Sequence, residues 1–246
     1  MPNENNEPIQ VYKLKQAETF LPIIRHEGDK TITFYGGDQA WYRTRVGRYS
    51  GCGAVAAADI FAYLAMQNLK LRSLFKNDSP EITVESFLKH MNAVIRHVAP
   101  LHIPVLDIPY GGLTSLPRFT KSCVKFAASR GVALTGHCYN NNELDLDGAA
   151  RSAGEQLSLD NPVALLIMQN ESLKDIAYID AYGKPASADL RFHWIVITSM
   201  MKRAGKTIVE ASSEGAKVSV DFENVWNCNG DSPFGWRGIA YFDVAV

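Results

Sequence analysis

The sequence lacks the marks of several common protein classes. Its four cysteines form no CxxC pair and are scattered along 246 residues, at Cys52, Cys123, Cys138 and Cys228, which excludes a disulfide scaffold. No run of about 18 residues is both apolar and uncharged, so no transmembrane helix is expected. The N-terminal residues, MPNENNEPIQ, lack the basic start and the apolar run of a secretory signal. We therefore expect a soluble, cytoplasmic protein with reduced cysteines.

The chain also carries almost no net charge. Its 25 Lys and Arg residues are balanced by 26 Asp and Glu residues, which leaves a formal net charge of −1. This balance provides no general electrostatic attraction for a nucleic acid backbone or an anionic membrane, so neither is an expected partner. With 46% apolar residues, a chain of this length can bury roughly 70–75% of its surface and fold without disulfides or metals.

Helix signals occupy most of the first 160 residues. Residues 51–69 are rich in alanine and apolar nearly all round, which predicts a buried helix. A second helix is expected from the N-cap Thr83 to His97, and a third after Ser115, with Pro117 near its first turn and Gly131 just past its end. A fourth is expected over residues 147–157. We therefore expect residues 1–160 to form a mainly helical lobe.

The remaining residues, 161–246, have the composition of β-strands. Short β-branched and aromatic runs alternate with turn residues, in the order PVALLIMQ, FHWIVITSM, KTIVEAS, AKVSV and GIAYFDVAV. Helices followed by strands are typical of the α+β class, with a helical lobe packed on an antiparallel sheet. We expect one two-lobed domain spanning residues 1–246.

Cys52 is the strongest candidate for a catalytic residue. It lies between two glycines at the start of the predicted buried helix, in the segment RYSGCGAVAAADIFAYLA. The unpaired N–H groups of a helix N-terminus carry partial positive charge, and Arg43, Arg45 and Arg48 precede the cysteine. Both effects favour a thiolate, which is the nucleophilic form, so we expect a lowered pKa. The alternative is a small buried residue in a packing seam.

His193 is the candidate base for this nucleophile. It opens the apolar strand FHWIVITSM just after a polar loop, so its ring is expected at the end of the sheet. It follows Cys52 by 141 residues, within the range of roughly 130–150 that separates the two catalytic residues in papain-like peptidases. The alternative is an ordinary strand histidine. Trp194, the next residue, is expected either to pack in the core or to wall the substrate groove.

The order of these motifs resembles the papain-like cysteine peptidase superfamily, nearest to bacterial relatives of the double-glycine leader (bacteriocin-processing) peptidases. The resemblance rests on Cys-Gly opening an Ala-rich helix, HWIVIT on a strand, and later SSEG and VDFENVW segments. It implies a two-lobed papain-like fold in which Cys52 is the nucleophile and His193 the base. It also implies a polar residue that orients the histidine and an upstream Gln in the oxyanion hole.

The chain departs from the family pattern at these last two positions. The family's Gln stands five to seven residues before the Cys, where this chain has Arg45, Val46 and Gly47, and the nearest glutamine is Gln39. SSEG replaces the NSWG segment that carries the orienting Asn, and alignment on the glycine assigns that position to Ser212. Glu210, in the same strand phase, is an alternative, and both residues fit equally well as solvent-facing strand residues.

Metal and cofactor sites are not indicated. Cys123, Cys138, His102 and Cys228 lack the spacing of zinc ligands. The Gly36-Gly37 and Gly111-Gly112 pairs have no phosphate-binding context.

The sequence thus predicts a cysteine peptidase or amide hydrolase that acts on a peptide or protein substrate through Cys52, His193 and Ser212. Two other functions stay open. A catalytically weak or inactive module on the same fold would only bind peptides. An acyl transferase would use the same Cys-His pair with an amine in place of water.

Overall fold

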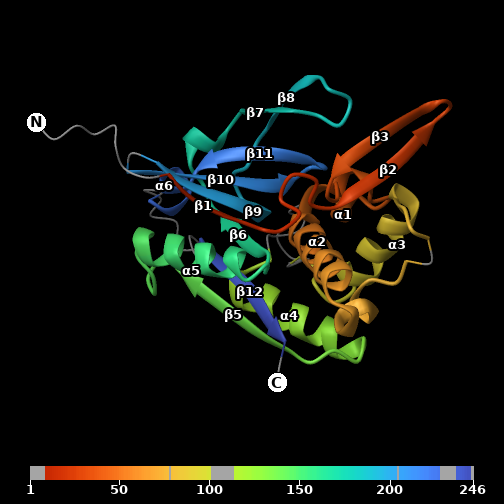
Figure 1. Cartoon of the computed structure of the whole chain (residues 1–246), viewed down its shortest axis with the longest axis horizontal. Helices are drawn as coiled ribbons and strands as arrows, with labels where there is room; N and C mark the ends of the chain where they lie inside the picture. The colour runs from red at the N-terminus through yellow and green to blue at the C-terminus, as the bar shows by residue number, and fades with distance from the viewer. Residues whose placement is uncertain (1–8, 78, 101–113, 204, 228–236, 245–246) are drawn as a thin grey trace, which may run out of the picture.

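An antiparallel sheet forms the centre of the molecule (Figure 1). The computed structural model describes residues 9–77, 79–100, 114–203, 205–227 and 237–244. The strand order is β11-β10-β9-β6-β12-β5, and β1 pairs with the free part of β9. The strands are β1 (Gln10–Lys13), β5 (Leu134–Asn140), β6 (Val163–Ile167), β9 (His193–Arg203), β10 (Lys206–Ser213), β11 (Ala216–Asp221) and β12 (Gly238–Val244). Together with the helices, this arrangement confirms the α+β class.

The long strand β9 organises this sheet. Its first eight residues are buried, as is all of β6, because both strands are covered on their two faces. β6 pairs with residues 193–197 of β9 and β1 with residues 199–202. A bulge interrupts the pairing with β10, since Glu210 faces Ser199 whereas the next residue, Ala211, faces Ile197. The extra residue, Thr198, changes which β10 side chains share a face with His193.

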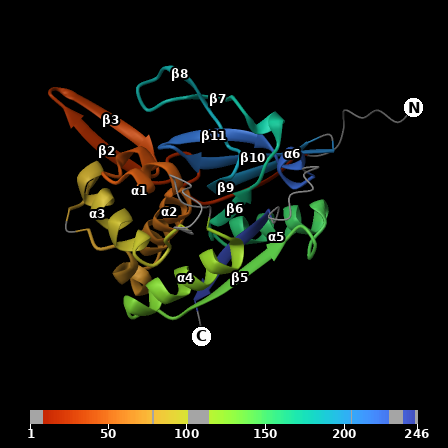
Figure 2. The same cartoon turned by 180° about the vertical axis from the view of Figure 1, so that it is seen from behind.

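Helices cover both faces of the sheet. α5 (Leu146–Ser158) lies in front of it in Figure 1, and α4 (Leu116–Ser129) lies in front when the molecule is seen from behind in Figure 2. α2 (Cys52–Gln67) packs against β9 and β6, with α3 (Val84–Ile95) beside it. All but the last two residues of α2 are buried, as its apolar sequence predicts. These four helices match the expected ranges to within two residues at each end.

Aromatic stacking joins α2, α4 and the sheet into one core. Phe61 of α2 stacks on Phe126 of α4 at 4.9 Å between ring centroids. Trp194 of β9 stacks on Phe119 of α4 at 4.1 Å. Gly53 lies against Trp194, where a Cβ atom would come within 3.2 Å of the indole. The small residue after Cys52 thus lets the start of α2 approach the start of β9.

The expectation of a mainly helical N-terminal lobe is incomplete. β1 and β5, both from the first 160 residues, belong to the main sheet. A second sheet is formed by β2 (Pro22–Glu27), β3 (Lys30–Tyr35) and β4 (Ile82–Thr83), and β7 (Ile176–Ile179) pairs with β8 (Pro185–Ala188). Two short helices are α1 (Arg45–Ser50) and α6 (Phe222–Trp226). β1 was missed because its partner lies about 190 residues away in the chain.

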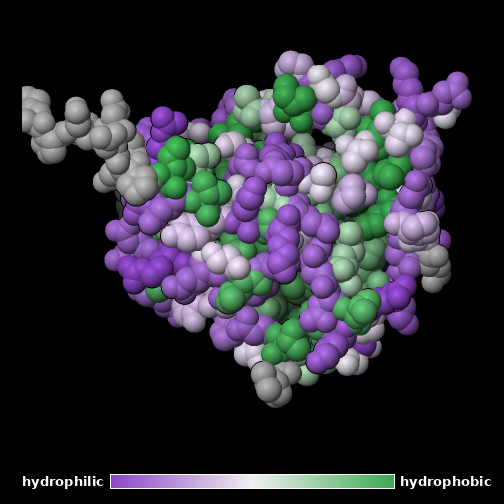
Figure 3. Space-filling model, viewed as in Figure 1, coloured by the Kyte–Doolittle hydropathy of each residue, from purple (hydrophilic) through white to green (hydrophobic). Residues whose placement is uncertain are grey.

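The surface agrees with the composition. On the face drawn in Figure 3, hydrophilic residues predominate and apolar residues form separate patches. Within the described residues, no helix combines the length and apolar character needed to cross a membrane.

Candidate active site

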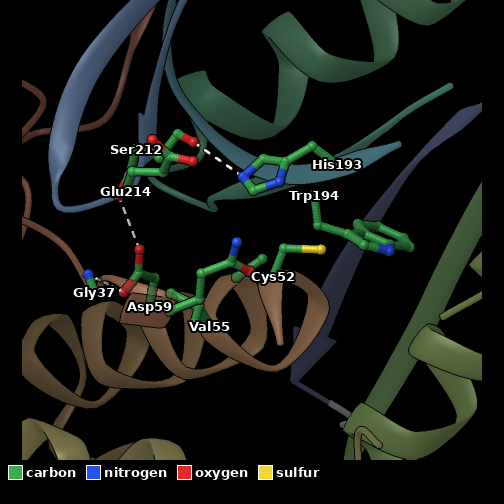
Figure 4. Close-up of a pocket in the computed structure, with 11 residues that line it drawn as sticks. Gly37, Cys52, Val55, Asp59, His193, Trp194, Ser212 and Glu214 are labelled. Atoms are coloured by element: carbon green, nitrogen blue, oxygen red, sulfur yellow. Dashed lines mark hydrogen bonds between the residues drawn. The ribbon is translucent and has the colours of Figure 1, made fainter. Parts of the chain in front are cut away.

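Cys52 is the first residue of α2. α1 ends at Ser50, and Gly51 joins the two helices. Gly51 provides no side-chain cap, so the first N–H groups of α2 are left for other partners. The Cys52 side chain rises toward β9 with its sulfur beside Trp194 (Figure 4), and the residue is only 6% exposed. The predicted position at the N-terminus of a buried helix is therefore what the structure shows.

His193 is the first residue of β9 and is 7% exposed. The preceding residue, Phe192, has a φ of 53°, so the chain turns sharply before it enters the strand. His193 and Cys52 line the same small cavity, which has room for about one water molecule (Figure 4). The sequence predicted that these two residues meet at one site, and the structure brings them together.

Ser213, and not Ser212, hydrogen-bonds His193. The Nε2 atom of His193 lies 3.1 Å from Ser213 Oγ. Ser212 pairs with Val196, which is three residues from His193 and so points to the other side of β9. Without the bulge, Ser212 would face Ile197 and share the side of His193. The expected contact is thus displaced by one residue, because the sequence does not reveal the bulge.

Glu210, the alternative orienting residue, lies away from His193. Its carboxylate accepts a hydrogen bond from Ser199 Oγ at 3.0 Å and approaches the Lys217 ammonium at 3.4 Å. It therefore stabilises the pairing of β9 and β10 far from the cavity.

The Cys52 thiol does not have the lowered pKa that its helix position predicts. Burial raises the pKa of Cys52 to about 11, although backbone hydrogen bonds from Trp194 and Gly53 act in the opposite direction. The three upstream arginines are exposed, and Arg48 donates to the backbone carbonyls of Tyr42 and Arg43. Desolvation outweighs the helix N-terminus here, so the expectation of a resting thiolate is wrong.

The His193 imidazole is also held in its neutral form. Burial lowers the pKa of His193 to about 4, and the nearby Asp189 carboxylate opposes this only in part. Asp189 is itself bound by the Arg191 guanidinium at 2.6 and 2.8 Å. At neutral pH the structure therefore holds a thiol beside a neutral imidazole.

Gln39 is a site residue whose distance from Cys52 along the sequence conceals its role. It begins the 3-10 turn η1 (Gln39–Trp41), which Asp38 caps by accepting a hydrogen bond from the Ala40 N–H. The Gln39 side chain lines the cavity, and among the described residues its buried Oε1 has no hydrogen-bond partner. Thirteen positions separate it from Cys52, but η1 and α1 coil much of that segment and bring the two together. Only the folded chain reveals this proximity.

Residues 36–39, which we call the strap, carry Gln39 to the cavity. The Gly215 N–H donates to the Gly37 carbonyl at 2.9 Å, and the Tyr35 N–H donates to the Gly215 carbonyl at 2.8 Å. Gly215, with a φ of 71°, forms the turn between β10 and β11 together with Glu214. The strap is therefore fixed to the strand end that also carries Ser213.

Trp194 walls the cavity on the α4 side. Its Nε1–H donates to the Thr114 carbonyl at 2.9 Å, which fixes the indole between α2 and α4. This combines both expectations for the residue, because the ring packs in the core and also borders the site.

The structure offers no alternative metal chemistry in the part of the chain it describes. Across those residues, no three His, Cys, Asp or Glu side chains cluster as metal ligands do. Cys123 is buried in α4 and Cys138 lies on β5, and both are free thiols. His102 and Cys228, the other two residues of that possible zinc ligand set, lie outside the described residues.

Comparison with known proteins assigns no family to this chain. No protein-family model matches it, and no curated protein matches it. Its function is therefore inferred from the chemistry of the cavity and from the order of its motifs.

Proposed function

We propose that this chain is a cytoplasmic, papain-like cysteine hydrolase that cleaves a peptide or amide bond. The single observation that carries the proposal is the shared cavity of Cys52 and His193, a thiol at a helix N-terminus and an imidazole at a strand start. In a two-lobed papain-like fold, α2 would supply the nucleophile from one side and β9 the base from the other. The antiparallel sheet packed against α2 is consistent with that arrangement.

The hydrogen bond of His193 assigns a role to each ring nitrogen. Ser213 Oγ engages Nε2, which leaves Nδ1 for the thiol. If the neutral ring carries its proton on Nε2 and donates it to Ser213, the Nδ1 lone pair can accept the Cys52 proton as the sulfur attacks the carbonyl carbon. The imidazolium then protonates the leaving amine, and the C–N bond breaks to give a thioester. Water, deprotonated by Nδ1, hydrolyses the thioester and restores the thiol.

The oxyanion formed during attack would be held by two kinds of donor. One is the backbone N–H of Cys52 at the start of α2. The other is the Gln39 amide, whose NH₂ group can turn toward the cavity because its oxygen is not committed to a described partner. The space for about one water molecule is also enough for the carbonyl oxygen of a substrate.

The buried thiol favours a second candidate, the peptide-binding module. A Cys52 pKa of about 11 leaves little thiolate at neutral pH, so a packing role would fit the same burial. Under this alternative, the cavity would recognise a peptide without cleaving it.

The two candidates differ in labelling and turnover. We suggest treating the full chain with an epoxide- or vinyl-sulfone-based peptide probe, and incubating it with a mixed peptide library analysed by mass spectrometry. The variants Cys52→Ala and His193→Ala should lose both labelling and hydrolysis. Cys138→Ala is the matched control, because Cys138 is a free, partly exposed thiol on β5. Gln39→Ala should lower kcat roughly 10²- to 10³-fold, as expected for loss of an oxyanion donor.

Each outcome supports or opposes hydrolysis. Cleavage that needs Cys52 and His193 supports the hydrolase, and attachment of an added primary amine to the product favours the acyl transferase. Saturable peptide binding with no cleavage and no labelling of Cys52 would identify the binding module and overturn the proposal.

A further inference from the structure

Asp59 is a carboxyl group buried in the middle of the apolar helix α2. It lies two turns after Cys52, is 1% exposed, and borders the same cavity. The mechanism proposed above makes no use of it. A buried carboxylate without a cation is costly, so the form in which Asp59 exists needs an explanation.

The hydrogen bonds around Asp59 favour a protonated carboxyl group. Its Oδ1 accepts the Gly37 N–H at 2.8 Å. Its Oδ2 lies 2.9 Å from Ser212 Oγ, and the same Oγ lies 2.8 Å from the Tyr35 carbonyl oxygen. Ser212 has one hydroxyl proton and cannot donate to both oxygens at once.

A proton on Oδ2 resolves this conflict. The acid then donates to Ser212 Oγ, and Ser212 donates to the Tyr35 carbonyl. That carbonyl points away from β2, because the Tyr35 N–H on the same edge of β3 donates to the Gly215 carbonyl, and Ser212 is the donor that faces it. With Asp59 ionised, either the carboxylate or the Tyr35 carbonyl would lose its hydrogen bond.

The strap is packed directly on this chain of hydrogen bonds. Gly36 has a φ of 92°, and a Cβ atom there would collide with Ser212 Oγ and lie 2.6 Å from Asp59 Oδ2. A Cβ atom on Gly37 would lie 3.1 Å from Oδ1. The backbone therefore replaces water around the carboxyl group (Figure 4).

We propose that Asp59 acts as a neutral carboxylic acid that positions the strap, and with it Gln39, against the active site. Asp59 is thus a positioning residue that acts through the strap and through Ser212, the neighbour of Ser213. The positioning role depends on the proposed hydrolase function only in its predicted effect on kcat.

The groups around Asp59 supply no positive charge at neutral pH. Tyr35 and Tyr42 feel the Asp59 charge and have pKa values raised chiefly by burial, so they stay neutral. Cys52 on α2 and His193 on β9 are neutral, as described. Glu214, on the turn after β10, has a pKa raised by burial and by neighbouring carboxylates. Burial likewise raises the pKa of Asp59 to about 7, and the hydrogen bond from the Gly37 N–H, which stabilises the carboxylate, opposes this only in part.

Ionisation of Asp59 should therefore loosen the strap as the pH rises through about 7. In that range neither Cys52, with a pKa near 11, nor His193, with a pKa near 4, changes its protonation. The direction in which folding stability changes with pH follows from proton binding. The folded chain holds this proton up to about pH 7 and the unfolded chain releases it near the ordinary value of 3.8, so stability falls as the pH rises between these values.

Asp59→Asn tests the proposal because an amide reproduces the hydrogen bonds of the neutral acid. Its oxygen can accept from Gly37 and its NH₂ can donate to Ser212. We expect kcat of this variant within about twofold of the parent at pH 6, without the decline in kcat above pH 7. Asp59→Leu, which keeps the branched shape of the side chain and loses both bonds, should lower kcat at least tenfold with little change in KM. Glu214→Gln is the control carboxyl variant and should retain the decline near pH 7.

Two measurements do not depend on catalysis. Infrared difference spectra of the parent chain should show a carboxylic acid C=O band at pH 6 that is lost by pH 8 and is absent from Asp59→Asn. The Tm of the parent should fall relative to that of Asp59→Asn between pH 5 and pH 7. Absence of the acid band at pH 6, or an Asp59→Asn variant as impaired as Asp59→Leu, would overturn the proposal. If the acid band is present but the parent hydrolyses no peptide, Asp59 is still a neutral acid, and only the proposed hydrolase function is rejected.

Discussion

The protonation of Cys52 and His193 gives the sharpest prediction. At pH 7, a thiol of pKa about 11 is ionised in about one molecule in 10⁴, whereas an exposed cysteine of pKa about 8.5 is about 3% ionised. Moving the proton from Cys52 to His193, with a pKa of about 4, is unfavourable by seven pKa units, or about 10 kcal/mol before their attraction is counted. A contact ion pair gains only about 4 kcal/mol at an effective dielectric constant of about 20. The resting pair should therefore be neutral.

The assay is the rate of alkylation of each cysteine as a function of pH. A small neutral haloacetamide is used from pH 5 to pH 10, and modified peptides are quantified by mass spectrometry. Cys138, which is partly exposed, serves as the reference thiol within the same chain. Cys52 should react about 300-fold more slowly than an exposed thiol at pH 7, with a rate that rises tenfold per pH unit and no plateau below pH 8.

A papain-like ion pair would give a different result. Cys52 would then react at a nearly constant rate between about pH 5 and pH 8, and thiolate absorbance in the ultraviolet would disappear in both Cys52→Ser and His193→Ala. That outcome would show that burial does not control this thiol, and it would refute the reasoning from desolvation. It would leave the proposed hydrolysis intact but would replace attack by a neutral thiol with attack by a preformed thiolate.

Two further predictions concern histidines. Ser213→Ala should lower kcat about two- to tenfold by releasing Nε2 of His193, and Ser213→Thr, which keeps the hydroxyl group, should retain the kcat of the parent. Equal kcat values for the parent and the two variants would refute an orienting role. His90, whose Nε2 lies 3.2 Å from the Ala58 carbonyl oxygen, has a pKa lowered by burial to about 3, so it binds a proton in the unfolded chain near pH 6.5 and resists one when folded. The free energy of unfolding therefore decreases as the pH falls below 6.5. Between pH 7 and pH 4.5, the free energy of unfolding of His90→Gln, measured in urea, should decrease by about 3 kcal/mol less than that of the parent. An equal decrease in the two chains would contradict this.

Local patterns in the sequence predict the parts of the fold that depend on near neighbours. The ends of α3 and α4 follow from their caps and a terminal glycine, and α2 follows from its alanine-rich apolar run. Cys52 and His193 were paired from helix and strand context and from their separation, and the structure brings them to one cavity. The helices and the local contexts of the two residues are encoded within short windows of the chain, whereas their pairing also depends on the 141-residue separation.

The parts that the sequence did not predict depend on distant or irregular contacts. One extra residue, Thr198, transfers the His193 contact from Ser212 to Ser213. Gln39 reaches the cavity only because η1 and α1 coil the chain before Cys52. The Cys52 pKa depends on burial by Trp194 and the surrounding core, which outweighs the local helix N-terminus visible in the sequence. Each of these effects requires the packed tertiary structure.

The pairing of β1 with β9 sets an order of events during synthesis. Gln10 pairs with Lys202 and Lys13 with Ser199, so β1 must wait for about 190 further residues before its partner exists. At a translation rate of about 5–20 residues per second, that delay is roughly 10–40 s. During it, the β1 segment is an unpaired strand that a neighbouring nascent chain or a chaperone can engage. An early segment of the polypeptide is thus among the last to reach its native partner, and the pairing of β1 with β9 is a late step in folding.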